Sequence, residues 1–183
     1  TGVKTEDSLI SVDQNVVIGD HRTVKGNELT TILELAEQRG LSTGVVSTAR
    51  LTHATPAACY AHSAERDWES DGDLPQAARD AGVADIARQL VDFPYGDGLE
   101  VALGGGRSKF LPQSMNDPED EGSQGERLDK RDLTEEWKRK NKSSAYVWNK
   151  QQFAAVDGKK TKHLLGLFER SHMEYEHDRA TDK

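Results

Sequence analysis

Apolar residues in this chain are concentrated in short stretches of two kinds, separated by long polar segments. Four runs rich in β-branched and aliphatic residues are typical of buried strands, and they lie at 44–48, 99–103, 145–148 and 164–168. Helical spacing predicts helices at 28–39, from about 56, and at 74–78, 84–92, 132–140 and 151–155. Because helical crossovers connect parallel strands, this alternation predicts an α/β fold with a mainly parallel sheet.

The first helix is expected to begin after Asn27, whose side chain can cap it, and to end before Gly40. Its apolar positions are Leu29, Ile32, Leu33 and Ala36. This face is expected to pack on the strand at 44–48.

The polar segments suggest a division of the chain. Residues 1–26 and 112–132 are expected to be loops, the second a long surface loop, and 170–183 a solvated tail. We therefore expect three parts: 1–111 as the central part of the α/β domain, 112–160 as a polar insertion, and 161–183 as a return strand and tail.

Composition narrows the function classes. The 183 residues include 32 acidic and 24 basic side chains, which gives a net charge of -8. Without a basic stripe, nucleic acid is disfavoured as a partner, and the acidity is compatible with a salt-adapted protein. No apolar run approaches the roughly 20 residues of a membrane span. The single cysteine, Cys59, cannot form a disulfide within the chain and is expected to pack rather than act as a nucleophile.

Imidazole, hydroxyl and guanidinium side chains are concentrated at one predicted strand-to-helix corner. Pro56 suits the first helical position, which makes Thr55 the expected N-cap, and His53 precedes it in the loop. Ligands bind at the carboxyl ends of strands in open α/β sheets, and Arg66 can reach back over this corner. A guanidinium can bond two phosphate oxygens at once, so the corner predicts half of a phosphate and metal site. The alternative for Arg66 is a solvated surface side chain.

Several short motifs carry a family resemblance. They are His53-Ala-Thr55-Pro56-Ala, Tyr60-Ala-His62-Ser, Arg66-Asp-Trp68, Leu103-Gly-Gly-Gly-Arg107, Tyr146-Val-Trp-Asn149 and Gly166-Leu-Phe-Glu169. In this order they resemble the metal-dependent alkaline phosphatases, in the variant with histidine at the first position. The resemblance implies a three-layer α/β/α fold with a mainly parallel central sheet. It also implies hydrolysis of small phosphate monoesters, inhibition by inorganic phosphate, zinc and magnesium as cofactors, a homodimer, and a periplasmic or secreted location.

The same resemblance implies roles for individual residues. Arg66 would hold the substrate phosphate, Thr55 would coordinate magnesium, and His53 would lie beside the magnesium. The family's nucleophilic serine and zinc ligands would lie before Thr1 or after Lys183. The chain is therefore expected to be an internal segment, inactive by itself.

A calcium site is also implied by animal members of the family. Glu119 in the acidic loop, the Phe168 carbonyl and Glu169 would supply three of its oxygens, and the fourth ligand would fall near or beyond Lys183. The alternative is that the acidic loop is merely solvated.

Other readings remain open at this point. The chain can be an inactive fragment or a small metal-binding module. Gly104–Gly106 can be a nucleotide-binding loop, although no Lys-Ser/Thr pair follows it and a tight turn is favoured. A zinc cluster within the polar tail is disfavoured against solvated side chains, and its members would be His163, His172, Glu174, Glu176 and His177.

Overall fold

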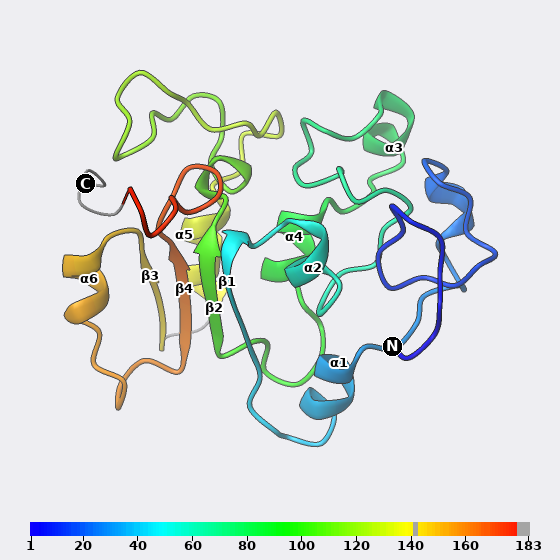
Figure 1. The fold of residues 1–183 in the computed structure, drawn as a ribbon, viewed down its shortest axis with the longest axis horizontal. Coiled ribbons are helices and arrows are strands. Elements are labelled where there is room, and N and C mark those ends of the chain that lie inside the picture. The colour runs from blue at the N-terminus through cyan, green and yellow to red at the C-terminus, as the bar shows by residue number, and fades with distance from the viewer. Residues whose placement is uncertain (141–142, 179–183) are drawn as a thin grey trace.

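The structure is a computed structural model that describes residues 1–140 and 143–178. Its strands are β1 (Gly44–Arg50), β2 (Val101–Gly105), β3 (Ser144–Val147) and β4 (His163–Leu167). They form one sheet in the order β1-β2-β4-β3, and every neighbouring pair is parallel. The predicted α/β class and the parallel sheet are therefore confirmed. The carboxyl ends of the strands meet at the upper edge in Figure 1, where the segments at 51–57, 106–112 and 168–173 gather.

Short helices alternate with these strands. Their bounds are α1 (Ile32–Glu37), α2 (Ala54–Ala57), α3 (Gln76–Asp80), α4 (Ile86–Val91), α5 (Leu133–Lys140) and α6 (Lys150–Ala154), with single 3-10 turns η1 (His21–Thr23) and η2 (Arg107–Lys109). The helices predicted at 84–92, 132–140 and 151–155 are confirmed to within two residues. β3 lies in the same sheet as the other strands although it falls in the predicted insertion at 112–160, and the three-part division stays a prediction.

The main core lies against one face of the sheet. Val45, Ala102, Leu165 and Tyr146 share one row across the four strands. The first three are buried in a cluster with apolar side chains of α4 and α5, such as Leu90 and Trp137. The neighbouring row on the opposite face begins with Val46, which is 73% exposed. The same row ends with Val147, which is 4% exposed, so the opposite face is open at β1 and covered at β3.

The start of α1 differs from the prediction. The helix begins at Ile32 and is capped by Thr31, which forms a reciprocal capping box with Glu34. Asn27 is not the cap, because its side-chain amide donates to the carbonyl of Thr23 at 2.8 Å. Leu29 precedes the helix.

The buried side of α1 is also a correction. Ile32, which was expected to face the core, is 73% exposed, whereas Glu34 and Glu37 are buried. Glu34 receives a contact from His62 Nε2 at 2.7 Å, and Glu37 accepts a hydrogen bond from the Thr43 hydroxyl at 2.5 Å. Hydrogen-bonding partners outside the helix therefore decide its orientation, which apolar spacing cannot reveal.

The segment at 112–132 has no helix or strand within its described residues, as predicted. It is not simply solvated, however, because Asp117 and Arg127 are 2% and 1% exposed. Isolated bridges pair Pro112 with Arg127 and Asn116 with Gln124, so the segment folds back on itself. Buried ion pairs, described below, fix it to the domain.

Candidate functional site

The strand-to-helix corner follows β1 and is built differently from the prediction. α2 begins at Ala54 with His53 in the N-cap position, and the His53 side chain makes no capping hydrogen bond. Thr55 is therefore not the cap; it lies inside the helix and is exposed. Pro56 is the third helical residue, a position that tolerates proline because the N–H groups of the first turn have no partner within the helix.

Arg66 does reach back over the corner, as predicted. Its Nη2 lies 3.2 Å from His53 Nε2. A guanidinium can only donate, so Nε2 accepts and the proton of the neutral ring sits on Nδ1. Burial, followed by the positive charges of Arg50 and Arg66, lowers the pKa of His53 and favours this neutral form. Both side chains are only partly exposed.

A second arginine at the corner was missed by the sequence reasoning. Arg50, the last residue of β1, donates from Nε and Nη2 to the carboxylate of Glu69 at 2.8 and 2.7 Å. The Thr52 hydroxyl donates to the same carboxylate at 2.5 Å. Burial alone would raise the pKa of Glu69, but the hydrogen bonds from Arg50 and Thr52 outweigh it and lower that pKa.

This pairing separates the roles of the two arginines. Glu69 neutralises Arg50, whereas the described residues place no carboxylate in an ion pair with Arg66. Arg50 was available as a signal in the sequence, since it comes two residues after the predicted strand at 44–48 and so stands at the ligand-binding edge of the sheet. Glu69 lies outside the predicted strands and helices and gave no such signal.

His172 joins the corner from the segment after β4. Its Nδ1 accepts from the backbone N–H of Arg50 at 3.2 Å, and its ring lies edge-on to His53 with 5.2 Å between centroids. The side chain is exposed, but its contacts correct the prediction of an uninvolved tail residue. His163, from the same predicted tail cluster, is 3% exposed within β4. Among the described residues, no group of three or more metal-binding side chains exists.

Gly104 and Gly105 end β2, and Gly106 makes the turn that follows the strand. Gly106 has φ +95°, and its N–H donates to the carbonyls of Glu169 and Ser171. A Cβ at Gly105 would come within 2.0 Å of the Ser171 carbonyl oxygen, so only glycine fits there. The N–H group of Arg107 is also bonded to the Glu169 carbonyl. These donors are therefore used to hold the segment after β4, which confirms the turn and argues against a nucleotide loop.

The three residues of the predicted calcium site come from segments that meet at Arg107. Arg107 Nη2 donates to Glu119 at 2.6 Å, and Nη1 donates to the carbonyl of Leu167, next to Phe168, at 2.9 Å. The Glu169 carbonyl accepts from two backbone N–H groups. The carboxylate of Glu119 thus already has a cationic partner.

Cys59 is partly buried and packs against the main core. Burial raises the pKa of its thiol, which favours the uncharged form, in line with a packing residue. None of the described helices is both long and apolar enough to cross a membrane.

A parallel sheet whose carboxyl edge gathers guanidinium and imidazole groups defines an α/β protein with a candidate anion site at its strand ends. A sequence profile of the family "Alkaline phosphatase" matches residues 1–183, so the chain belongs to the alkaline phosphatase family.

Curated relatives of the chain support the same family assignment. The chain is 44% identical to the tissue-nonspecific alkaline phosphatase of Gallus gallus over 99% of its length, and 41% identical to an alkaline phosphatase of Gadus morhua over 97%. It spans only 36% and 38% of those two proteins.

Solved structures share the fold. The alkaline phosphatase of Thermus thermophilus matches 97% of the chain with a TM-score of 0.67 and 26% identity, and the chain covers 28% of that protein. The cold-active alkaline phosphatase of a Shewanella species matches 96% of the chain with a TM-score of 0.62 and 26% identity, with 31% of that protein covered.

Proposed function

We propose that this chain is part of an alkaline phosphatase that hydrolyses small phosphate monoesters, and that Arg66 holds the phosphate group. The observation that carries the proposal is the contrast within the corner. Arg50 is neutralised by Glu69, whereas Arg66 has an imidazole as its neighbour and no carboxylate ion pair among the described residues. A cation of this kind at the strand ends is available to a phosphate from solution.

The neighbouring groups prepare Arg66 for that role. His53 accepts from one nitrogen of the guanidinium and so fixes its orientation without cancelling its charge. The lowered pKa of His53 favours the neutral ring, whose Nε2 lone pair can accept from Arg66. In this arrangement Arg66 binds the phosphate in the ground state and stabilises the negative charge of the transferring group.

The donor set of the chain suits a supporting part in metal binding. Thr55 offers an exposed hydroxyl oxygen of the kind that magnesium prefers, and we assign it to magnesium. Nε2 of His53 faces Arg66, so we place His53 beside the magnesium rather than among its ligands. Bound metal ions would activate the nucleophile and the attacking water. We assign the zinc ligands to parts of the enzyme other than this chain, and we include a homodimer and a periplasmic or secreted location in the proposal.

The test is Arg66→Ala in the complete enzyme that contains these residues. We expect the affinity for inorganic phosphate to fall by about 1.5–3 kcal/mol, the range for hydrogen bonds to charged groups. Inhibition of aryl phosphate hydrolysis by phosphate measures this loss. Arg22→Ala is the matched control, because the Arg22 side chain is 78% exposed and, among the described residues, its ion pair is with Asp20. Unchanged phosphate inhibition in Arg66→Ala would show that Arg66 is a surface residue only.

We also propose, as a lesser part of the function, a calcium ion at Glu119, the Phe168 carbonyl and Glu169. Because Arg107 already binds Glu119, calcium must share that carboxylate with a guanidinium, which weakens the site. We expect calcium to raise the thermal midpoint of the complete enzyme, and Glu119→Gln to abolish the rise. If calcium shifts neither protein, the loop does not carry the ion.

A further inference from the structure

The flank of the corner contains a second set of converging donors. Glu69 occupies Nε and Nη2 of Arg50, which leaves Nη1 directed elsewhere. Nη1 lies 2.7 Å from His172 Nε2 and 3.4 Å from the Ser171 hydroxyl oxygen. The other ring nitrogen of His172 lies 3.2 Å from the backbone nitrogen of Arg50. Both nitrogens of the imidazole therefore face donors of the same residue.

No protonation state of His172 satisfies both of these contacts. Guanidinium and backbone N–H groups donate and cannot accept, while a neutral imidazole has one N–H and one lone pair. Whichever nitrogen carries the proton, one contact sets two donors face to face, and a charged ring would do so twice. When the backbone N–H is satisfied by Nδ1, the Nε2 proton and an Nη1 proton converge on one region. An anionic oxygen in that region accepts from both.

This second donor pair lies close to Arg66. The His172 ring is edge-on to the His53 ring, 5.2 Å between centroids, and His53 in turn contacts Arg66 at 3.2 Å. Two imidazole rings thus separate the two guanidinium groups. His172 is exposed and the Arg50 side chain is 20% exposed, so both can be reached from solution.

We propose that Arg50 and His172 form a second anion subsite, which binds a carboxylate on the leaving group of a phosphate monoester whose phosphate is held by Arg66. The inference rests on the proposed function. The enzyme would then favour monoesters of hydroxy acids over neutral monoesters of the same size, because only the former supply an acceptor to both donor sets.

The test compares two unreactive ligands of equal length, phosphonoacetate and propylphosphonate, by calorimetry on the complete enzyme with metals in excess. His172→Ala should weaken phosphonoacetate about tenfold, the effect of losing one charge-assisted hydrogen bond, and leave propylphosphonate within about twofold. His177→Ala, an exposed histidine of the same segment, should change neither affinity. We choose His172 for the variant because removal of Arg50 would leave the buried carboxylate of Glu69 unpaired.

The outcomes distinguish a failure of the second subsite from a failure of the proposed function. If the wild-type enzyme binds inorganic phosphate and propylphosphonate but phosphonoacetate is indifferent to His172→Ala, the second subsite is refuted and the proposed function stands. Equal weakening of both phosphonates would also refute it, because His172 would then act through the Arg66 site. If the wild-type enzyme binds neither phosphonate nor inorganic phosphate, the proposed function fails, and this inference with it.

Discussion

Arg107 and Arg127 on one side and Arg66 on the other have sharply different surroundings. The side chains of Arg107 and Arg127 are fully buried, and each is surrounded by carboxylates. Arg66 is partly exposed, and its guanidinium contacts the imidazole of His53. A buried guanidinium with several carboxylates has its hydrogen-bonding capacity used within the fold, whereas one without a carboxylate can accept an anion from outside. Charge compensation, not residue type, therefore separates the structural arginines from the proposed binding arginine.

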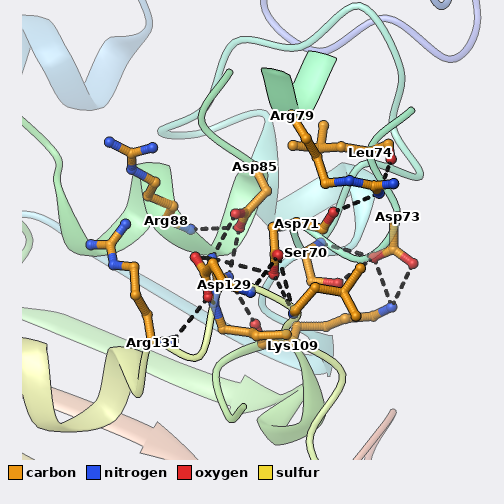
Figure 2. A network of polar contacts seen from close by, with 12 residues as sticks. Ser70, Asp71, Asp73, Leu74, Arg79, Asp85, Arg88, Lys109, Asp129 and Arg131 are labelled. Atoms are coloured by element: carbon orange, nitrogen blue, oxygen red, sulfur yellow. Dashed lines mark hydrogen bonds and ion pairs between the residues drawn. The ribbon is translucent and has the colours of Figure 1, made fainter. Parts of the chain in front are cut away.

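Arg127 joins the loop after β2 to the start of α4. It donates to both oxygens of Asp85, the N-cap residue of α4, at 3.0 and 2.9 Å, and to Asp129 at 2.6 Å. Asp71 lies 3.7 Å away and accepts from the backbone N–H groups of Leu128 and Asp129. Figure 2 shows these carboxylates converging from separate segments. The polar loop is thus held by ion pairs where an apolar core is lacking.

The largest effect is expected from Arg127→Met. The variant keeps much of the side-chain volume but leaves Asp85 without its cationic partner in a buried position. Breaking a buried ion pair in this way costs about 3–5 kcal/mol. Urea unfolding of the complete enzyme measures the loss, and Arg139→Met, exposed on α5, is the control. A change below about 1 kcal/mol would mean that the network tolerates the loss of its centre.

A smaller loss in the free energy of unfolding is expected at acidic pH. Burial would raise the pKa of Asp129 and Glu126, but hydrogen bonds from Arg127 and Lys109, respectively, outweigh it, so both pKa values lie below the usual range. Carboxyl groups with a lowered folded pKa stabilise the fold fully above their unfolded pKa, roughly 4, and this stabilisation is lost as the pH falls through the folded pKa. The free energy of unfolding should therefore decrease from about pH 5 downward.

Asp71 opposes this loss of stability with falling pH. Burial raises the pKa of Asp71 despite the nearby charge of Arg127, so its protonation favours the fold as the pH falls between the folded and unfolded values. Asp129→Asn removes a group with the opposite sign and should make the decrease less steep. Urea unfolding at several pH values checks this, and identical slopes in both proteins would contradict the assignment.

The sequence was sufficient for those parts of the fold that depend on apolar spacing. The four strands and the helices near α4 and α5 were predicted because most of their buried residues are apolar and recur at regular intervals. The face of α1 and the path of the loop after β2 were not, because Glu34, Glu37 and Arg127 are buried polar residues. Glu34 and Arg127 have partners far along the chain: His62 is 28 positions from Glu34, and Asp85 is 42 positions from Arg127. Spacing carries no record of such pairs.

The residues of the candidate site were likewise predictable only in part. His53 and Arg66 are only 13 positions apart, at one predicted strand-to-helix corner, so their proximity could be predicted. His172 is 122 positions from Arg50 and was assigned to a solvated tail. Its place at the corner follows from the register of β4 beside β2, which sets where the chain emerges from the sheet. Only the assembled sheet contains that information.

The smallest expected change is the effect of Arg66→Met on stability, and it makes the comparison of the two arginine groups sharpest. Arg66 lacks a carboxylate ion pair within the described residues, so its loss leaves no buried charge uncompensated. We expect the free energy of unfolding to stay within about 0.5 kcal/mol of wild type, as for substitutions away from packed features. The same protein should lose phosphate affinity, because the guanidinium fork is gone. Urea unfolding and phosphate titration of one preparation measure both quantities. A destabilisation as large as that of Arg127→Met would place Arg66 among the structural arginines, and the proposed phosphate contact would lose its main support.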